Sequence, residues 1–154
     1  MEINSTLIEA HIARERNGKI EFLLLKRAND QKYPNIWQMV TGKINENEKA
    51  YSTAIREIKE ETNITVKNIC IVPNVNSFYN SDDDSINLIP VFLTKINAEI
   101  EVQISNEHQD YKWVNIKEAK KLLAWPGQIK SVKYIHDYLS NKKESLNFIE
   151  ITIR

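Results

Sequence analysis

Residues 42–48 read Gly-Lys-Ile-Asn-Glu-Asn-Glu, and after seven further residues, 56–61 read Arg-Glu-Ile-Lys-Glu-Glu. On a helix, Glu57 lies three positions before Glu60 and four before Glu61, so the three carboxylates project from neighbouring positions on one flank. Like charges at this spacing cost an exposed helix about 0.2–0.5 kcal/mol per pair. A hard divalent cation reverses that penalty, because Mg²⁺ takes oxygen ligands and keeps waters for substrate phosphates. A metal site on a helix is therefore one interpretation of this segment.

The helix is predicted over residues 48–62, where Ala50, Ala54 and Ile58 recur at a spacing of four. Asn47 is the expected N-cap, with Glu48 just inside the first turn, where the helix dipole favours a carboxylate. A simpler interpretation of the acidic cluster is a solvated helix face. In that interpretation Arg56 forms an ion pair with Glu60, four residues later.

Short runs rich in Ile, Val and Leu predict strands over residues 6–13, 20–25, 36–40, 64–75, 86–96 and 111–114. Asn17-Gly18 between the first two is typical of a hairpin turn. A helix capped by Asn115 is expected through Leu123, and a second helix follows Trp125-Pro126-Gly127. No linker separates these pieces. We therefore expect one domain over residues 1–154, of α/β or α+β class, with a mixed sheet, a central helix and a helical C-terminal portion.

The composition excludes several functional classes. Lys and Arg number 21, as do Asp and Glu, so the formal net charge is zero and nothing draws the chain as a whole to nucleic acid or to an acidic membrane. The three glycines are too dispersed for a dinucleotide-binding turn or a phosphate-binding P-loop. No apolar run is long enough to span a bilayer, and no secretory signal is visible. The single cysteine, Cys70, fits a reducing compartment, so we expect a cytoplasmic protein.

The full spacing of the acidic segment resembles the signature of the Nudix family. That signature is glycine, five residues, glutamate, seven residues, arginine-glutamate, an aliphatic residue, any residue, two glutamates, any residue, glycine and an aliphatic residue. The residues in register are Gly42, Glu48, Arg56, Glu57, Ile58, Glu60, Glu61 and Ile64. Such a match favours the metal site over the solvated face.

One position departs from the signature: Asn63 stands where the family has glycine. That glycine ends the helix, where a left-handed backbone is commonly needed. Asparagine is the other residue that tolerates this conformation best. We therefore expect the geometry to survive with slight strain.

The resemblance implies a Nudix-type α/β/α sandwich, in which a loop–helix–loop presents the carboxylates beside a mixed sheet. It implies a Mg²⁺- or Mn²⁺-dependent hydrolase acting on nucleoside diphosphates linked to another group. Glu57 and Glu61 would be the principal metal ligands, Glu60 a supporting ligand and the Gly42 carbonyl a further one. Arg56 and Glu48 would form an orienting pair. The general base stays open between a glutamate of the signature and a carboxylate from a later loop.

Two further segments resemble one branch of the family, the dATP pyrophosphohydrolases that act as dihydroneopterin triphosphate pyrophosphatases. Residues 36–42 match its W-Q-x-V-T-G motif and residues 107–113 its E-H-x-x-Y-K-W motif. By this match Glu107 completes the metal site or serves as the base. The alternative is an ordinary surface glutamate in a loop.

Four residues outside the signature are candidates for substrate binding. Lys26 and Arg27 follow an apolar strand and would meet phosphates from its end, unless they only solvate that end. Trp37 offers a face for a purine or pterin, although a tryptophan beside an isoleucine is more often part of a core. Tyr79, next to Phe78, is the better stacking candidate by exposure.

The expected function is a Mg²⁺-dependent pyrophosphohydrolase that cleaves a (deoxy)nucleoside or pterin triphosphate to the monophosphate and pyrophosphate. The alternatives are a hydrolase of dinucleoside polyphosphates, nucleotide sugars or capped RNA, and a Nudix-like domain that senses a nucleotide without cleaving it. We expect no membrane or nucleic-acid partner. The alternating Ile149, Ile151 and Ile153 either cover the sheet or pair with a second copy, so a homodimer stays open.

Overall fold

Strand β2 (Leu7–Arg16) lies at the centre of the sheet in the computed structural model, which describes residues 1–140 and 148–153. The other strands are β1 (Glu2–Asn4), β3 (Lys19–Arg27), β4 (Trp37–Gln38), β5 (Val40–Lys43), β6 (Cys70–Asn80), β7 (Ser85–Ile96), β8 (His108–Val114) and β9 (Ile149–Glu150). Their order is β4-β3-β2-β7-β6-β9, with β1 pairing β7, β5 pairing β2 and β8 pairing β3. β2 is parallel to β7 and antiparallel to β3 and β5, so the sheet is mixed, as predicted.

The β2–β3 hairpin forms where the sequence predicts it. Asn17 and Gly18 both have positive φ, 53° and 74°, which matches the turn that Asn-Gly favours between antiparallel strands. Along β2, Ile8, Ala10 and Ile12 belong to one buried cluster and Ala13 belongs to the other, so the strand contributes to both faces of the sheet.

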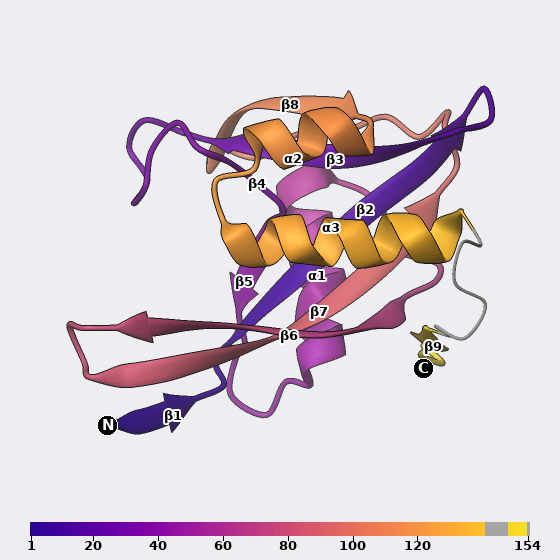
Figure 1. Ribbon diagram of the computed structural model, residues 1–154. Coiled ribbons are helices and arrows are strands. Elements are labelled where there is room, and N and C mark those ends of the chain that lie inside the picture. Colours follow the sequence, from indigo (N-terminus) through magenta and orange to yellow (C-terminus); the bar gives the residue numbers. More distant parts are fainter. Residues whose placement is uncertain (141–147, 154) are drawn as a thin grey trace.

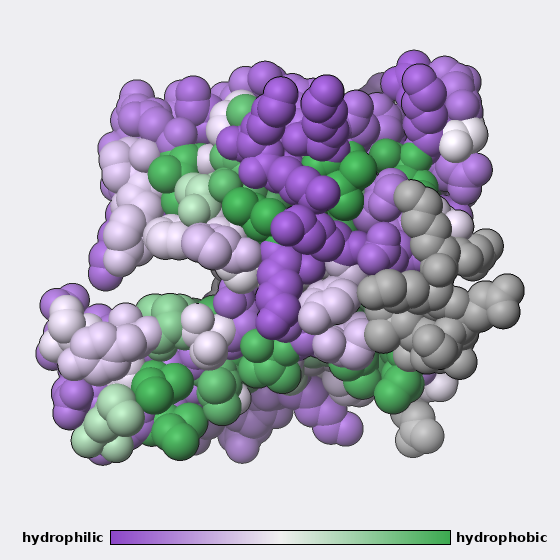
Figure 2. Space-filling view, in the orientation of Figure 1, coloured by the Kyte–Doolittle hydropathy of each residue, from purple (hydrophilic) through white to green (hydrophobic). Residues whose placement is uncertain are grey.

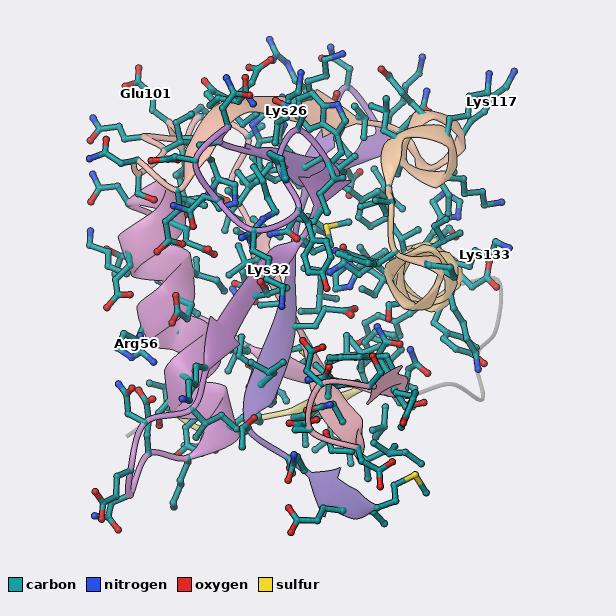
Figure 3. The ribbon with its side chains drawn as sticks, turned by 90° about the vertical axis from the view of Figure 1, so that its left-hand side faces the viewer. Lys26, Lys32, Arg56, Glu101, Lys117 and Lys133 are labelled. Carbon is teal, nitrogen blue, oxygen red and sulfur yellow. The ribbon has the colours of Figure 1, made fainter. Side chains whose placement is uncertain are left out.

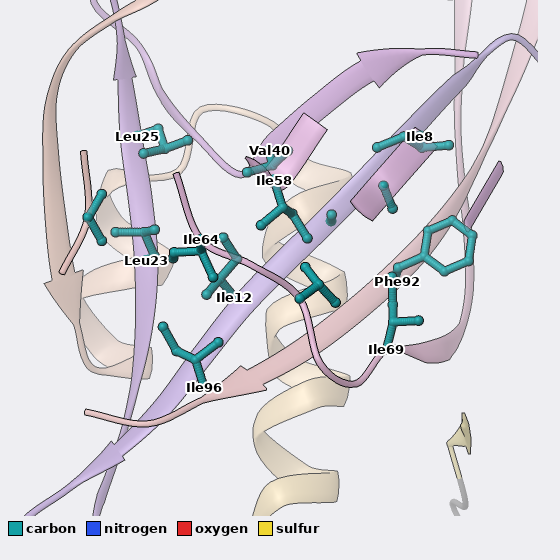
Figure 4. Close-up of a cluster of buried hydrophobic side chains, with 14 residues drawn as sticks. Ile8, Ile12, Leu23, Leu25, Val40, Ile58, Ile64, Ile69, Phe92 and Ile96 are labelled. Atoms are coloured by element: carbon teal, nitrogen blue, oxygen red, sulfur yellow. The ribbon is translucent and has the colours of Figure 1, made fainter. Parts of the chain in front are cut away.

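Helices cover both faces, which confirms the predicted α/β/α arrangement. Figure 1 shows α2 (Ile116–Leu122) and α3 (Pro126–Leu139) on one face and α1 (Ala50–Thr62) on the other. Ile8 and Ile12 of β2 pack with Ile58 of α1 in one buried cluster, drawn in Figure 4. Ala13 of β2 packs with Val132 of α3 in the second. None of the helices in the described part of the chain is long and apolar enough to cross a membrane.

Two strand predictions are wrong in their bounds. The apolar run that begins at Ile64 predicts a strand, but β6 starts only at Cys70, because Ile64, Val66 and Ile69 are buried against α1 without pairing in the sheet. The run over 36–40 divides at Met39, which leaves β4 on the edge beside β3 and β5 on β2.

The predicted N-cap of α1 is also wrong. The helix begins at Ala50 after Lys49, which makes no side-chain cap, and Asn47 lies in a left-handed turn with φ 63°. Glu48 therefore precedes the helix. By contrast, the Asn115 cap is confirmed, because its Oδ1 accepts the Glu118 backbone N–H at 2.9 Å.

The C-terminal strand pairs with its own sheet. β9 is antiparallel to β6, with Ile149 opposite Ile71, and the Ile151 N–H donates to the Ile69 carbonyl at 2.9 Å. Ile151 packs partly on the α1 cluster, whereas Ile149 is 66% exposed. The sequence predicts a strand over residues 147–154 from this alternation, and its first and last residues lie outside the described residues.

Candidate metal centre

Helix α1 presents the three predicted glutamates at three depths. Glu61 is only 3% exposed, the Glu57 side chain is 13% exposed and the Glu60 side chain is 56% exposed. Ile58 is fully buried in the core on the same helix and anchors this turn against the sheet. The carboxylates therefore extend from the edge of the core to solvent.

Strand β5 brings Gly42 directly against Glu57. A Cβ built on Gly42 would overlap the Cγ, Cδ and Oε1 atoms of Glu57. Pairing with Ile8 of β2 fixes the Gly42 backbone. Only glycine at this position therefore leaves room for the Glu57 carboxylate. The Gly42 backbone and the Glu57 side chain, both predicted metal ligands, lie side by side.

Arg56 binds the acidic side chains around it. Its guanidinium donates to Glu48 Oε1 and Oε2 at 2.9 and 3.0 Å, to Glu57 at 2.8 Å and to Glu60 at 3.2 Å. It also donates to the Lys43 carbonyl at 3.0 Å. The hydrogen bonds from Arg56 lower the pKa of Glu48 to about 2. The expected pairing with Glu60 is present, but Glu48 is the partner held by two hydrogen bonds.

The sequence did not single out Thr53, which holds Glu48 from the other side. Thr53 Oγ1 donates to Glu48 Oε2 at 2.8 Å, and the Asn45 backbone N–H donates to the same oxygen at 3.1 Å. No sequence pattern marks a threonine inside a helix as the hydrogen-bond partner of another side chain. Thr53 has this partner because Glu48 lies just before the first turn of α1.

Glu107, in the segment just before β8, lies close enough to Glu57 and Glu61 to raise the pKa of both. Its carbonyl accepts the Ala28 N–H at 2.9 Å. Burial, with the charges of Glu57 and Glu107, raises the pKa of Glu61 well above its ordinary value. Partial burial, with Glu60 and Glu107 nearby, raises the pKa of Glu57 although Arg56 opposes it. Carboxylates thus share a region where each disfavours ionisation of the others, which a cation would relieve.

The residues fit a hard divalent ion in their chemistry. Every predicted ligand offers oxygen, as Mg²⁺ and Mn²⁺ prefer. Glu61 Oε2 is buried and finds no hydrogen-bond donor among the described residues. Within residues 1–140 and 148–153, no three acidic, histidine or cysteine side chains already converge as the ligands of an ion. Coordination of one ion by three of these carboxylates at once would therefore require a change of rotamer.

Arg27 reaches this region, and His108 beside it is neutral. The Arg27 side chain donates to the Lys32 carbonyl at 2.6 Å. Its positive charge lowers the pKa of Glu61, against the larger effects of burial and of the neighbouring carboxylates. Burial, and then the charge of Arg27, lowers the pKa of His108 to about 4. Neither ring nitrogen of His108 has a partner among the described residues.

Trp37 lies between a core and two lysines. Its ring packs partly against the α3-side cluster. The ammonium groups of Lys26 and Lys112 lie 5.9 and 5.3 Å from the ring centroid. These contacts agree with the packing interpretation of Trp37 and put Lys26 beside it.

Tyr79 lies on the β6–β7 hairpin, away from these groups in the sequence and the sheet. It is 58% exposed, and its hydroxyl donates to Asp84 Oδ1 at 3.1 Å. Figure 2 shows an indentation between this hairpin and the segment that leads from β3 to β4. On that segment Tyr33 makes an edge-to-face contact with Trp125, with ring centroids 5.2 Å apart. Figure 3 views this side, with Arg56 on α1 to the left and Lys32 nearer the centre.

A buried polar pair on the opposite face was not predicted. His11 Nε2 and Glu9 Oε2 lie 2.5 Å apart, both fully enclosed, and Asn76 Nδ2 donates to Glu9 Oε1 at 3.1 Å. His11, Ser131 of α3 and Asn76 together lower the pKa of Glu9 against the effect of its burial. The only signal in the sequence is that Glu9 and His11 occupy alternate positions of an otherwise apolar strand.

Comparisons with known proteins support one family. The model of the NUDIX domain matches residues 9–135. The bis(5′-nucleosyl)-tetraphosphatase (asymmetrical) of Caenorhabditis elegans is 35% identical over 113 residues, 72% of this chain and 79% of that protein. The dihydroneopterin triphosphate diphosphatase of Haemophilus influenzae is 26% identical over 127 residues, 72% and 75% of the two chains. The crystal structure of a C. elegans Ap4A hydrolase binary complex has a TM-score of 0.78 at 28% identity, covering 90% of this chain and 99% of that one.

Proposed function

The chain belongs to the Nudix family of hydrolases, which act on phosphoanhydride bonds, and from that premise we propose that it cleaves a dinucleoside polyphosphate asymmetrically with the help of a divalent metal ion. The observation that carries the catalytic part is the buried, unpartnered Oε2 of Glu61 beside Glu57 and Glu107. The substrate is supported by the C. elegans relative at 35% identity. This ranks the dinucleoside substrate, an alternative from the sequence, above the triphosphate that the sequence motifs favoured.

In the proposed reaction a water oxygen attacks one phosphorus, and the bond from that phosphorus to its bridging oxygen breaks. The water gives one proton to a carboxylate of the site, and the departing phosphate leaves as an anion. A dinucleoside tetraphosphate then yields a nucleoside monophosphate and a nucleoside triphosphate. A nucleoside triphosphate yields a monophosphate and pyrophosphate instead.

The chain's own residues divide the work. Mg²⁺ or Mn²⁺ would be held by the carboxylates of Glu57, Glu60, Glu61 and Glu107 and by the Gly42 carbonyl. When bound, such an ion supplies positive charge against the phosphate oxygens. Arg56 keeps the Glu57 carboxylate in place through its 2.8 Å hydrogen bond, and Glu48 holds Arg56. Glu57, Glu61 and Glu107 are the candidates for the base, because their carboxylates lie close enough to interact at the proposed metal site.

The same proposal assigns the indentation of Figure 2 to the substrate. Lys26 and Arg27 would meet the phosphates; for Arg27 this is supported by its positive charge, which lowers the pKa of Glu61 and so acts close to the metal site. Tyr79 on the hairpin offers an exposed ring for a nucleobase, and Trp37 contributes mainly by holding Lys26.

A second candidate is hydrolysis of a (deoxy)nucleoside or pterin triphosphate. It is favoured by the W-Q-x-V-T-G and E-H-x-x-Y-K-W matches and by the H. influenzae relative. The two candidates share the metal centre and differ in the leaving group.

Product analysis distinguishes them. Purified protein with Mg²⁺ is given diadenosine tetraphosphate, dATP or dihydroneopterin triphosphate, and products are separated by ion-exchange chromatography. We expect ATP and AMP in equal amounts from the dinucleotide, at a higher kcat/KM than pyrophosphate release from either triphosphate. Two ADP molecules, or faster pyrophosphate release, would contradict the dinucleotide assignment.

The catalytic assignment has its own control. Glu57→Gln and Glu61→Gln should lower turnover by orders of magnitude, and the exposed Glu60→Gln should lower it less. Thermal stabilisation by nucleotide without any turnover in the wild type would instead favour a sensing domain.

A further inference from the structure

Asn63 does more at the end of α1 than allow the backbone to turn. It has φ 60° and ψ 14°, the left-handed conformation that ends helices, and its N–H donates to the Lys59 carbonyl at 2.9 Å. Its side-chain Nδ2 also donates to Gln103 Oε1 at 2.9 Å. The glycine of the family signature would make the turn without this second contact.

Gln103 belongs to the segment between β7 and β8, which is tied to the last carbonyls of α1. The Gln103 N–H donates to the Thr62 carbonyl at 3.0 Å, and the Ser105 N–H donates to the Glu61 carbonyl at 3.3 Å. Val102 is buried in the α1-side cluster, and Ile104 packs partly against it. Figure 3 shows Glu101 of the same segment beyond this end of α1.

The attachment continues to Glu107 within two residues. Ser105 Oγ accepts the Glu107 N–H at 3.4 Å, and the Ser105 carbonyl accepts the His108 N–H at 3.2 Å. The other side of Glu107 is held where its carbonyl accepts the Ala28 N–H at 2.9 Å. The end of the helix that carries Glu61 is thus connected by successive hydrogen bonds to Glu107.

We propose that Asn63 and Gln103 are positioning residues, whose side-chain hydrogen bond fixes the segment 103–107 on α1 and so sets the place of Glu107 relative to Glu61. The role in catalysis rests on the proposed function, whereas the attachment itself does not. Three carboxylates near one another repel, so the loop that brings the third must be held by contacts of its own. The departure of Asn63 from the family signature supplies one of them.

The decisive variant is Asn63→Gly, because glycine adopts φ 60° more easily than asparagine and so keeps the turn that ends α1 while removing the side-chain contact. Amide hydrogen exchange is measured on the metal-free protein. We expect exchange at Ser105 and Gln103 to accelerate by about threefold to tenfold, the scale of one exposed hydrogen bond, while exchange in β2 is unchanged. With Mg²⁺, the ion concentration at half-maximal activity should rise and kcat should fall, each by a similar factor.

Gln103 gives the same test from the other partner. Gln103→Ala should also accelerate amide exchange and alter the metal dependence and kcat. Gln103→Glu should behave nearly as the wild type, because it keeps the acceptor. The double variant Asn63→Gly with Gln103→Ala should show no larger change in exchange or kcat than either single variant. Glu101→Gln is the matched control, because in the described part of the chain the backbone hydrogen bonds from this segment to the end of α1 come from Gln103 and Ser105 and not from Glu101.

Wild-type exchange at Ser105 in Asn63→Gly, or additive effects in the double variant, would overturn the proposal and leave Asn63 as a turn residue only. Accelerated exchange in a chain that hydrolyses no substrate would overturn the proposed function while supporting the attachment. Accelerated exchange with unaltered metal dependence and kcat in an active enzyme would overturn the positioning of Glu107.

Discussion

Gly42 and Glu57 occupy adjoining space so closely that a single Cβ on the first would overlap the carboxylate of the second. The glycine is therefore required by the side chain on the neighbouring helix, since its own φ is not left-handed. Backbone freedom, the usual reason for a glycine, plays no part at this position.

This contact predicts the effect of Gly42→Ala. Alanine can adopt the backbone at position 42, but its Cβ must displace Glu57 from its place beside Arg56. We expect kcat/KM to fall about 10²-fold, as for a catalytic group misplaced by about 1 Å, with most of the fold stability retained. Gly127→Ala is the matched control, because its Cβ would meet Asn76 rather than a carboxylate of the site. Equal losses of kcat/KM in the two variants would count against the explanation.

Glu61→Gln is expected to stabilise the metal-free protein while abolishing turnover. Folding raises the pKa of Glu61 above its ordinary 4.5, so between these two pKa values the folded chain keeps a proton that the unfolded chain releases. Wild-type stability therefore falls as the pH rises from 4.5 through the raised pKa and stays lower above it. Glutamine carries no proton to lose.

The measurement is the thermal midpoint without metal from pH 5 to pH 8. The advantage of Glu61→Gln should grow with pH, at about 2–4 °C for each kcal/mol in a chain of this size. Added Mg²⁺ should narrow the difference in thermal midpoint between Glu61→Gln and the wild type, because it should stabilise only the wild type. A difference that is constant across this range would show that Glu61 is not the group responsible.

The opposite sign is expected for Glu48. Its hydrogen bonds from Arg56 lower its pKa from 4.5 to about 2, so the stability it contributes is present above pH 4.5 and is lost as the pH falls toward 2. Urea unfolding of Glu48→Gln should show a smaller drop in stability between pH 6 and pH 3 than the wild type. Glu46→Gln, two residues earlier, is the matched control and should keep the wild-type drop.

His11→Leu should be strongly destabilising without affecting the chemistry. The substitution leaves Glu9 enclosed with its hydrogen bond from Asn76 but without the imidazole at 2.5 Å. Removing one partner of a buried pair costs about 3–5 kcal/mol, whereas replacing both often costs less. Urea unfolding should therefore find the double variant Glu9→Leu with His11→Leu more stable than His11→Leu alone. The reverse order would contradict this account.

The position of the carboxylates on α1 could be predicted because it depends on local spacing alone. Their depth could not, since Glu60 and Glu61 are neighbours in sequence yet differ from mostly exposed to almost fully buried. That difference comes from long-range contacts, among them the segment whose Ser105 bonds the Glu61 carbonyl. A pattern that lists residue types contains no such information.

The wrong N-cap has a comparable cause. Asn47 and Glu48 have the composition of a helix start, but the Glu48 carboxylate is bonded by Arg56, eight residues later. The chain must enter the helix at a point that lets these two side chains meet. Asn47 therefore adopts a left-handed turn, and the helix starts at Ala50.

The edge-to-face contact between Tyr33 and Trp125 joins the segment that leads from β3 to β4 to the start of α3. Both rings lie outside α1, so their substitution would change this segment while leaving the acidic side chains of α1 in place. Under the proposed function, in which that segment borders the substrate, the choice of substrate and the hydrolytic machinery would be free to diverge separately in descendants of this chain.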